Sequence, residues 1–435
     1  MASEWETVRL RDVCVKIGSG ATPRGGKEAY NGGATSLIRS QNIYNEGFHR
    51  DGLVYIDDNQ SAELRNVEVR TNDVLLNITG DSVARCCQVP ADVLPARVNQ
   101  HVAIIRPEPK SLDARFLRYV LVSHEYQSRL LALASAGATR PALTKSMIEE
   151  LDIPSPPLAE QKAIAAVLGA LDDKIELNRR INATLEGMAR ALFQSWFVDF
   201  DPVRAKLDGR KPKGMDKATA ALFPDAFQES SLGEIPQDWR LGSLGELVQL
   251  RTDRVDATPA KDSIRYIALE DMPSKSIDLS NFQLGSSVNS SITAFCKGDV
   301  LFGSMRPYFH KVGLAFFNGI TRTTTFVLRP KKDCFRHFAL LHFFSDDVVA
   351  YSTTASVGTT IPYVRWDSME SYNIAVPPDL LLEAFEKTVS PLVKRIAAQG
   401  EESRTLASLR DTLLPKLLSG ELRVPDAEKI VERTV

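Results

Sequence analysis

The chain has 435 residues, a length that predicts two to four domains. Hydrophobic residues make up 43% and charged residues 25%, as in a globular protein. It contains no run of 18 or more apolar residues, so no transmembrane helix is predicted. The formal net charge of −2 argues against a protein that binds DNA through overall positive charge alone. The five cysteines form no C-x-x-C pair, which favours a protein of the reducing cytoplasm.

Read in chain order, the sequence presents the same series of features twice. Short apolar runs at 73–78 and 101–105 predict strands, and residues 113–134 predict a helix. The series returns with strands at 299–303 and 325–328 and a helix at 335–351. From Ser135 and Ser356 onward the two copies keep a constant offset of 221 residues.

Each copy ends in a Pro-Pro pair that cannot continue a strand, and a long helix is predicted after each pair. Apolar residues recur in steps of three and four from Ile164 to Trp196 and, at the same offset, from Phe385 to Leu417. This heptad pattern predicts two coiled-coil helices, and two separate amphipathic helices are the alternative. Because each helix follows its own globular repeat, we expect the pair to be antiparallel.

Polar residues interrupt both heptad patterns at equivalent places, near the middle of each helix. Such residues cost stability but fix the register of a coiled coil and its choice of partner. We therefore expect them to face one another in an antiparallel pair. They are Asn178 and Asn182 in the first helix and Gln399 and Ser403 in the second.

Known catalytic motifs do not match the sequence. Ser155-Pro156-Pro157 lacks the aromatic residue that follows Pro-Pro in amino-methylating DNA enzymes, and so does the second Pro-Pro pair. The glycine-rich segment 18–27 fails the spacing of a phosphate-binding loop, so it is either a loop that touches DNA phosphate or a surface turn. The six histidines show no metal-ligand spacing. We therefore predict no catalytic residue and no metal site.

Four stretches, together with the repeat, resemble the specificity subunit of type I restriction–modification systems. The second Pro-Pro pair lacks the Glu-Gln-Lys continuation of the first, having Leu380-Leu381-Leu382-Glu383 instead. That difference leaves the predicted fold intact but bears on partner contacts at that end of the chain. The matching stretches are residues 153–164, 192–200, 233–239 and 413–422.

The resemblance implies an α+β protein with two pseudo-symmetric globular target recognition domains and two long antiparallel coiled-coil helices. The implied domains are target recognition domain 1 (1–157), a central long helix (158–200), a connector (201–237), target recognition domain 2 (238–378), a distal long helix (379–422) and a tail (423–435). Each domain would read one half of a split double-stranded DNA target. The helices would dock two methyltransferase subunits, and two restriction subunits would join them. The chain itself would be non-catalytic, with S-adenosylmethionine, ATP and Mg²⁺ on the partners.

Base readers in such domains should be Arg, Lys, Asn, Gln and Thr side chains on the loops between strands. The alternative for each is a surface salt bridge or a hydrogen bond within the fold. The candidates in the first repeat are Arg24, Lys27, Arg39, Gln41, Asn42, Asn99, Gln100, Arg140 and Lys145. Those in the second are Arg251, Arg254, Arg306, Tyr308, Lys311, Arg322, Thr323, Tyr363 and Arg365.

Two other classes of protein remain open from the sequence. A self-sufficient nuclease with recognition domains would need a catalytic domain, for which the two repeats and two helices leave no room. A purely structural scaffold would share the architecture but would not bind DNA.

Overall fold

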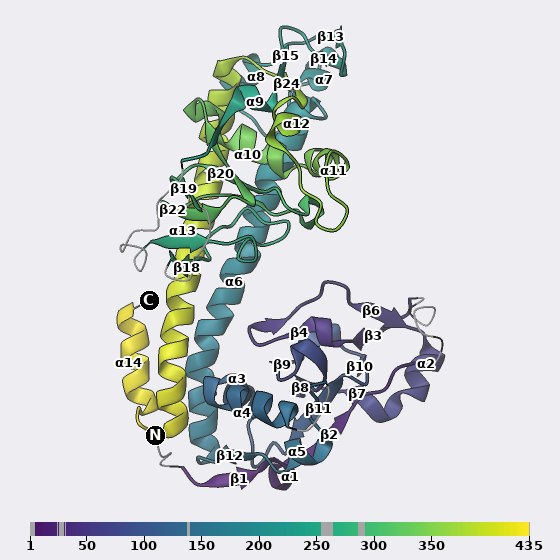
Figure 1. Cartoon of the computed structure of the whole chain (residues 1–435), viewed down its shortest axis with the longest axis vertical. Coiled ribbons are helices and arrows are strands. Elements are labelled where there is room, and N and C mark those ends of the chain that lie inside the picture. Colours follow the sequence, from purple (N-terminus) through teal and green to yellow (C-terminus); the bar gives the residue numbers. More distant parts are fainter. Residues whose placement is uncertain are drawn as a thin grey trace. The chain divides into compact units, whose positions relative to one another are not determined.

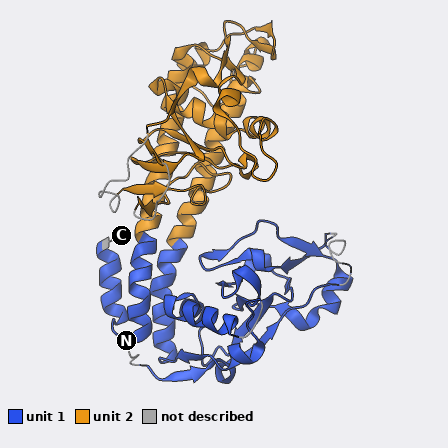
Figure 2. Cartoon of the chain, viewed as in Figure 1, with its two compact units in different colours: residues 1–173, 406–435 blue, residues 174–405 orange. Residues whose placement is uncertain are grey.

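The computed structural model describes residues 5–23, 25, 30, 32–136, 140–253, 264–285 and 292–434. The chain divides into two compact units, and Figure 2 colours unit 1 (residues 1–173 and 406–435) apart from unit 2 (residues 174–405). The boundary between the units crosses two long helices, α6 (Leu158–Phe197) and α13 (Asp379–Ser419). No helix in the described ranges is both long and apolar enough to cross a membrane.

Unit 1 contains two four-stranded sheets, with strand orders β2-β11-β8-β9 and β6-β3-β10-β7 (Figure 1). The short strands β1 and β12 join the beginning of the repeat to its end in an antiparallel pair, and β4 and β5 form a small ribbon. The strands are β1 (Thr7–Arg9), β2 (Cys14–Ser19), β3 (Thr35–Ile38), β4 (Ile43–Tyr44), β5 (Gly47–Phe48), β6 (Val54–Ile56), β7 (Glu68–Val69), β8 (Val74–Asn77), β9 (Cys86–Gln88), β10 (Ala96–Val98), β11 (Val102–Pro107) and β12 (Asp152–Pro154).

Unit 2 repeats this topology with the orders β16-β23-β20-β21 and β18-β17-β22-β19, and with the pair β15-β24. Each unit has one parallel pair in the second sheet, β3 with β10 and β17 with β22. The strands are β13 (Phe227–Ser230), β14 (Gly233–Pro236), β15 (Arg240–Ser243), β16 (Val248–Arg251), β17 (Arg265–Ile267), β18 (Gln283–Leu284), β19 (Ile292–Phe295), β20 (Val300–Gly303), β21 (Val312–Leu314), β22 (Gly319–Arg322), β23 (Thr325–Pro330) and β24 (Asn373–Val376).

An ion pair between a buried aspartate and a partly exposed arginine recurs at the end of the two central strands of the first sheet in each unit. The Asp73 carboxylate accepts two bonds from the Arg106 guanidinium, at 2.7 and 2.8 Å, and Asp299 accepts two from Arg329, both at 2.8 Å. A bidentate Arg–carboxylate pair of this kind has a specific geometry. Removing the arginine would leave the charge of the buried aspartate without a partner. The matching sequence motifs that begin at Asp73 and Asp299 are therefore part of a shared framework.

The helices predicted at 113–134 and 335–351 are each two helices, which corrects the sequence-based expectation. In unit 1, α3 (Ala114–Val122) and α4 (His124–Ser135) are separated by Ser123, whose hydroxyl accepts a bond from the backbone N–H of Tyr126. In unit 2, Ser345 caps α11 (Asp346–Thr354) after α10 (Arg336–Phe344) in the same way. A serine that caps a new helix offers the backbone N–H groups a partner outside the preceding helix.

The remaining α-helices are short, from 4 to 11 residues long. Residues 201–237 contain α7, α8 and the hairpin β13–β14, and the tail contains α14. These helices are α1 (Leu10–Val13), α2 (Asp58–Glu63), α5 (Lys145–Glu149), α7 (Asp201–Leu207), α8 (Lys217–Ala221), α9 (Leu244–Leu247), α12 (Trp366–Glu370) and α14 (Val424–Thr434).

The tryptophan that opens each repeat packs near the end of a long helix. Trp239 is buried, and its ring centroid lies 5.9 Å from that of Phe197 and 5.5 Å from that of Phe200, at the end of α6. In unit 1 the Arg423 guanidinium lies 4.8 Å from the centroid of the Trp5 ring, just beyond the end of α13. Both repeats thus begin with a tryptophan that packs near the end of a long helix, against phenylalanines in unit 2 and against an arginine in unit 1.

Within unit 2 the two long helices pair directly and run antiparallel. Asn178 of α6 donates to Ser403 of α13 at 3.2 Å and to Glu402 at 2.8 Å. One turn further along α6, Asn182 donates to the backbone carbonyl of Ile396 at 3.3 Å, earlier in α13. The antiparallel coiled coil is therefore confirmed, and the alternative of two separate amphipathic helices is wrong.

The polar residues of the seam differ in how well their hydrogen-bonding groups are satisfied. Asn182 also donates to the Asp278 carboxylate of the second repeat, at 3.1 Å. Gln399 is 1% exposed, and neither its Nε2 nor its Oε1 has a hydrogen-bond partner among the described residues. That the four residues fix the register stays a prediction, but their energetic contributions should differ.

We expect Gln399→Leu to raise the free energy of unfolding by about 1 kcal/mol, because an unsatisfied buried amide is removed. Asn182→Leu, the matched variant, should lower it by about 1–3 kcal/mol, because the buried Asp278 carboxylate loses a donor. Urea denaturation of the two variants and the wild type measures both changes. Equal effects of the same sign would contradict this account of the seam.

Candidate nucleic-acid interface

Three candidates of the first repeat hold a loop in place. Asn42 is fully buried, and its amide donates to the backbone carbonyls of His49 and Asp51 at 2.9 and 3.2 Å. Arg39 and Gln41 both donate to the carbonyl of Gly52, at 2.6 and 3.2 Å. Asn42 therefore positions the loop, while Gln41 is exposed on it and Arg39 partly so.

The other described candidates of this repeat lie on neighbouring turns. The Nε2 atom of the exposed Gln100 lies 3.1 Å from Nε2 of His101, and Nδ1 of His101 lies 2.6 Å from the Thr79 hydroxyl. Thr79 also forms a β-bridge with Ala142, two residues after the exposed Arg140. The loops around residues 79, 100 and 141 are thus brought together, and sequence reasoning had not singled out His101 or Thr79 for this role.

Asn99 and Lys145 have partners of their own within the first repeat. Asn99 is buried and accepts a bond from the backbone N–H of His101 at 3.1 Å. Lys145 is exposed and lies 3.4 Å from Glu149 on the same helix. Arg24 and Lys27, with Arg254 of the second repeat, lie outside the described residues.

The second repeat brings together the equivalent turns. Met305 forms a β-bridge with Tyr363, as Thr79 does with Ala142 in the first repeat. The hydroxyl of Ser304 donates to the carbonyl of Thr324 at 2.8 Å, which places the turn at 322–324 beside this bridge. The candidates that this arrangement gathers are Arg306, Tyr308, Arg322, Thr323, Tyr363 and Arg365, and all but the half-buried Arg306 are exposed.

Two candidates of the second repeat are held by contacts within the fold. Arg251 donates to the neighbouring Asp253 carboxylate at 3.0 Å. Lys311 donates to the carbonyl of Leu269 at 2.7 Å, and burial lowers the pKa of its ammonium group. Both are half-buried, whereas Tyr308, Arg322 and Thr323 are exposed. Among the residues that the structure describes, no three His, Cys, Asp or Glu side chains lie together as a metal site.

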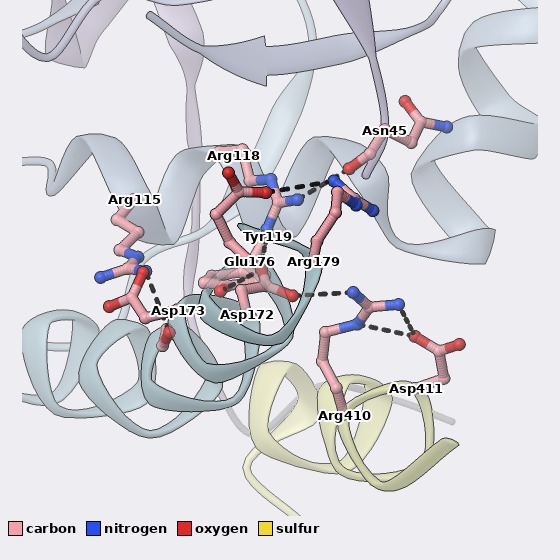
Figure 3. Close-up of polar contacts among 11 residues, drawn as sticks. Asn45, Arg115, Arg118, Tyr119, Asp172, Asp173, Glu176, Arg179, Arg410 and Asp411 are labelled. Atoms are coloured by element: carbon pink, nitrogen blue, oxygen red, sulfur yellow. Dashed lines mark hydrogen bonds and ion pairs between the residues drawn. The ribbon is translucent and has the colours of Figure 1, made fainter. Parts of the chain in front are cut away.

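A buried carboxylate joins the first repeat to the long helices within unit 1. Asp172 of α6 accepts bonds from Arg118 at 2.5 Å and from the Tyr119 hydroxyl at 2.7 Å, both on α3 (Figure 3). On its other side it accepts a bond from Arg410 of α13 at 2.7 Å. Burial opposes ionisation of Asp172, but these donors outweigh it and lower the pKa of the carboxyl group.

In unit 2 a different set of polar groups makes the corresponding junction. Glu186 of α6 accepts a bond from the Ser276 hydroxyl at 2.7 Å, next to the bond between Asn182 and Asp278. Burial raises the pKa of both Glu186 and Asp278, although the nearby Arg190 partly opposes the shift at Glu186. The two repeats are therefore attached to α6 by chemically different contacts.

Comparison with known proteins agrees with this architecture. Residues 2–187 match the family described as "Type I restriction modification DNA specificity domain". The MjaIX specificity subunit of Methanocaldococcus jannaschii is 25% identical over 97% of this chain and 94% of its own length. The HindI specificity subunit of Haemophilus influenzae is 25% identical over 81% of this chain and 87% of its own. The crystal structure of an S subunit from M. genitalium has a TM-score of 0.55 at 16% identity, covering 95% of this chain and 96% of that one.

In sequence and in fold, this two-repeat chain is similar to specificity subunits of type I restriction systems. Residues 2–187 belong to the family of type I restriction modification DNA specificity domains.

We expect Asp172→Asn to lower the free energy of unfolding by about 3 kcal/mol at pH 7, because the buried Arg118 loses its counterion. The folded-state pKa of Asp172 is lowered, so its contribution is present above the unfolded-state pKa and is lost as pH falls through the folded-state value. The difference between variant and wild type should therefore shrink in acid.

The neighbouring Asp173→Asn is the matched control. The Asp173 side chain is 68% exposed and pairs with the partly exposed Arg115, so its loss should cost at most about 1 kcal/mol. Urea denaturation at pH 7 and at pH 3 measures both variants. Equal costs for Asp172 and Asp173, or a difference between variant and wild type that persists in acid, would contradict the assignment.

Proposed function

We propose that this chain reads a two-part DNA target for a type I restriction–modification complex, one half with each repeat. One observation carries the proposal: the two repeats share a framework, but they differ in the residues on equivalent turns. The sheets, the buried Asp–Arg pairs and the β-bridges match between the repeats. At equivalent turns, however, the first repeat has Gly80-Asp81-Ser82 and the second has Pro307-Tyr308-Phe309.

A common scaffold with different side chains on its loops supports two half-sites of different sequence. Base edges are read by side chains placed in a groove, while phosphate contacts set the register. Exposed arginines lie on the loops that meet these turns. They are Arg140 in the first repeat and Arg322 and Arg365 in the second. They supply local positive charge that the net charge of −2 does not.

The proposal includes docking of two methyltransferase subunits and two restriction subunits. Each unit has a hollow beside its part of the long helices, of about 750 Å³ in unit 1 and about 560 Å³ in unit 2. Arg115 lines the first hollow and Arg336 the second, at the equivalent starts of α3 and α10. A hollow at the start of the equivalent helix in each unit supports a partner that binds twice.

In this proposal the chain is non-catalytic. S-adenosylmethionine, ATP and Mg²⁺ bind to the partner subunits in the cytoplasm. A self-sufficient nuclease and a scaffold without a DNA role are the competing functions, and the experiments below separate them.

The pure chain is expected to transfer no methyl group from labelled S-adenosylmethionine to DNA and to cleave no DNA. Addition of its methyltransferase partner should produce methylation at one split site. Transfer or cleavage by the chain alone would favour the self-sufficient enzyme. Unchanged site choice by the partner with and without this chain would favour the scaffold.

Replacing residues 1–157 with the first domain of another family member should change one half of the methylated site and leave the other half unchanged. The reciprocal swap of residues 238–378 is the control and should change only the other half. Sequencing of the methylated sites measures both. A change in both halves from a single swap would show that the repeats do not read independently.

A further inference from the structure

We propose that the Pro307–Phe309 turn of the second repeat contacts DNA bases through Tyr308 and Phe309, against the methyl groups of thymines in the major groove. This inference rests on the proposed function, and it assigns the apolar part of the reading surface to particular side chains. Sequence reasoning had included Tyr308 among the candidate DNA contacts and had passed over Phe309.

The turn belongs to an exposed apolar surface, here called the aromatic patch. Tyr308 is 51% exposed and Phe309 is 44% exposed, and their ring centroids lie 4.9 Å apart. Large apolar side chains gathered on a surface, and not needed by the core, indicate a binding site. The other members of the patch are Val357, Ile361 and Tyr363, each between 42% and 48% exposed.

Backbone contacts hold these residues together as one surface. Tyr363 forms β-bridges with both Met305 and Val357, and the N–H of Arg306 donates to the carbonyl of Pro362 at 2.7 Å. The patch is therefore a structured junction of two loops.

The turn itself is held in a strained conformation. Arg306 and His310, on either side of it, have φ values of 49° and 51°, in the left-handed region that non-glycine residues rarely adopt. His310 is buried, its Nε2 lies 2.8 Å from the carbonyl of Phe344, and its own carbonyl accepts from the N–H of Lys275 at 3.0 Å. Strain that the surroundings maintain is typical of functional sites, and rigid rings bind with little loss of conformational freedom.

The comparison between the repeats favours DNA over a protein partner as the occupant. A subunit that binds twice in the same way would need the same surface in both repeats. The first repeat has the polar Gly80-Asp81-Ser82 at this position, so its turn carries no aromatic ring where the second repeat has Tyr308 and Phe309. Half-sites of different sequence require different surfaces, and the exposed Arg322 and Arg365 next to the patch suit an anionic partner.

The mode of contact follows from the chemistry of the two rings. The major-groove edge of thymine presents a methyl group, which apolar side chains read. Removing one such methyl, by replacing thymine with uracil, should weaken binding about fourfold where a ring touches it, as expected for one buried methyl group.

The experiment uses the complete complex with its methyltransferase subunits and duplexes that carry the methylated target. Thymines of both half-sites are replaced one at a time by uracil, and affinity is measured for the wild type, Tyr308→Ala and Phe309→Ala. Leu207→Ala serves as the control, because Leu207 is 60% exposed at the end of α7, outside the patch. Thermal unfolding verifies that the variants are folded.

The wild type and Leu207→Ala should show the fourfold loss at one or two thymines of a single half-site. Tyr308→Ala or Phe309→Ala should bind the thymine and uracil duplexes equally at those positions. No methyl-dependent position in the wild type, or losses that persist in both variants, would overturn the inference. Weaker binding of the variants to the methyltransferase subunits without DNA would also overturn it, in favour of a protein-docking patch. Failure of the proposed function is distinguishable, because the wild-type complex would then show no preference for the target at all.

Discussion

The Asp172 carboxylate is the contact on which the arrangement of unit 1 depends. It is shared by Arg118 and Tyr119 of the first repeat and by Arg410 of the second long helix, so one charge joins three elements. A buried carboxylate with three donors resists displacement, since each donor would lose its partner. Unit 2 achieves the same attachment with Asn182, Asp278 and Glu186, at the cost of two carboxyl groups whose pKa values are raised by burial.

The two repeats share a framework and differ in their loops, which is the arrangement that the proposed reading of two half-sites requires. The bidentate pairs of Asp73 with Arg106 and Asp299 with Arg329 lie in the sheets, away from the turns that differ. A change at Tyr308 or Asp81 touches neither pair. The framework can therefore stay constant while the surface that faces a ligand varies.

The repeat, the heptad helices and their antiparallel pairing could be predicted from the sequence, because periodicity and a constant offset carry that information. The breaks at Ser123 and Ser345 could not, since a serine within an apolar run is also compatible with a continuous helix. The roles of Asn42, His101 and Thr79 depend on loops that meet only in the folded chain. Phe309 was missed because an aromatic residue in a sequence is usually part of a core, and only the structure shows its exposure.

The most direct test of the central claim is a genome-wide map of methylated bases in the host and in a strain that lacks this chain. If the two repeats read two half-sites, one split motif with an unspecified spacer should lose its methylation in the deletion strain and regain it on complementation. Loss of a continuous motif, or no change in any methylated motif, would contradict the account.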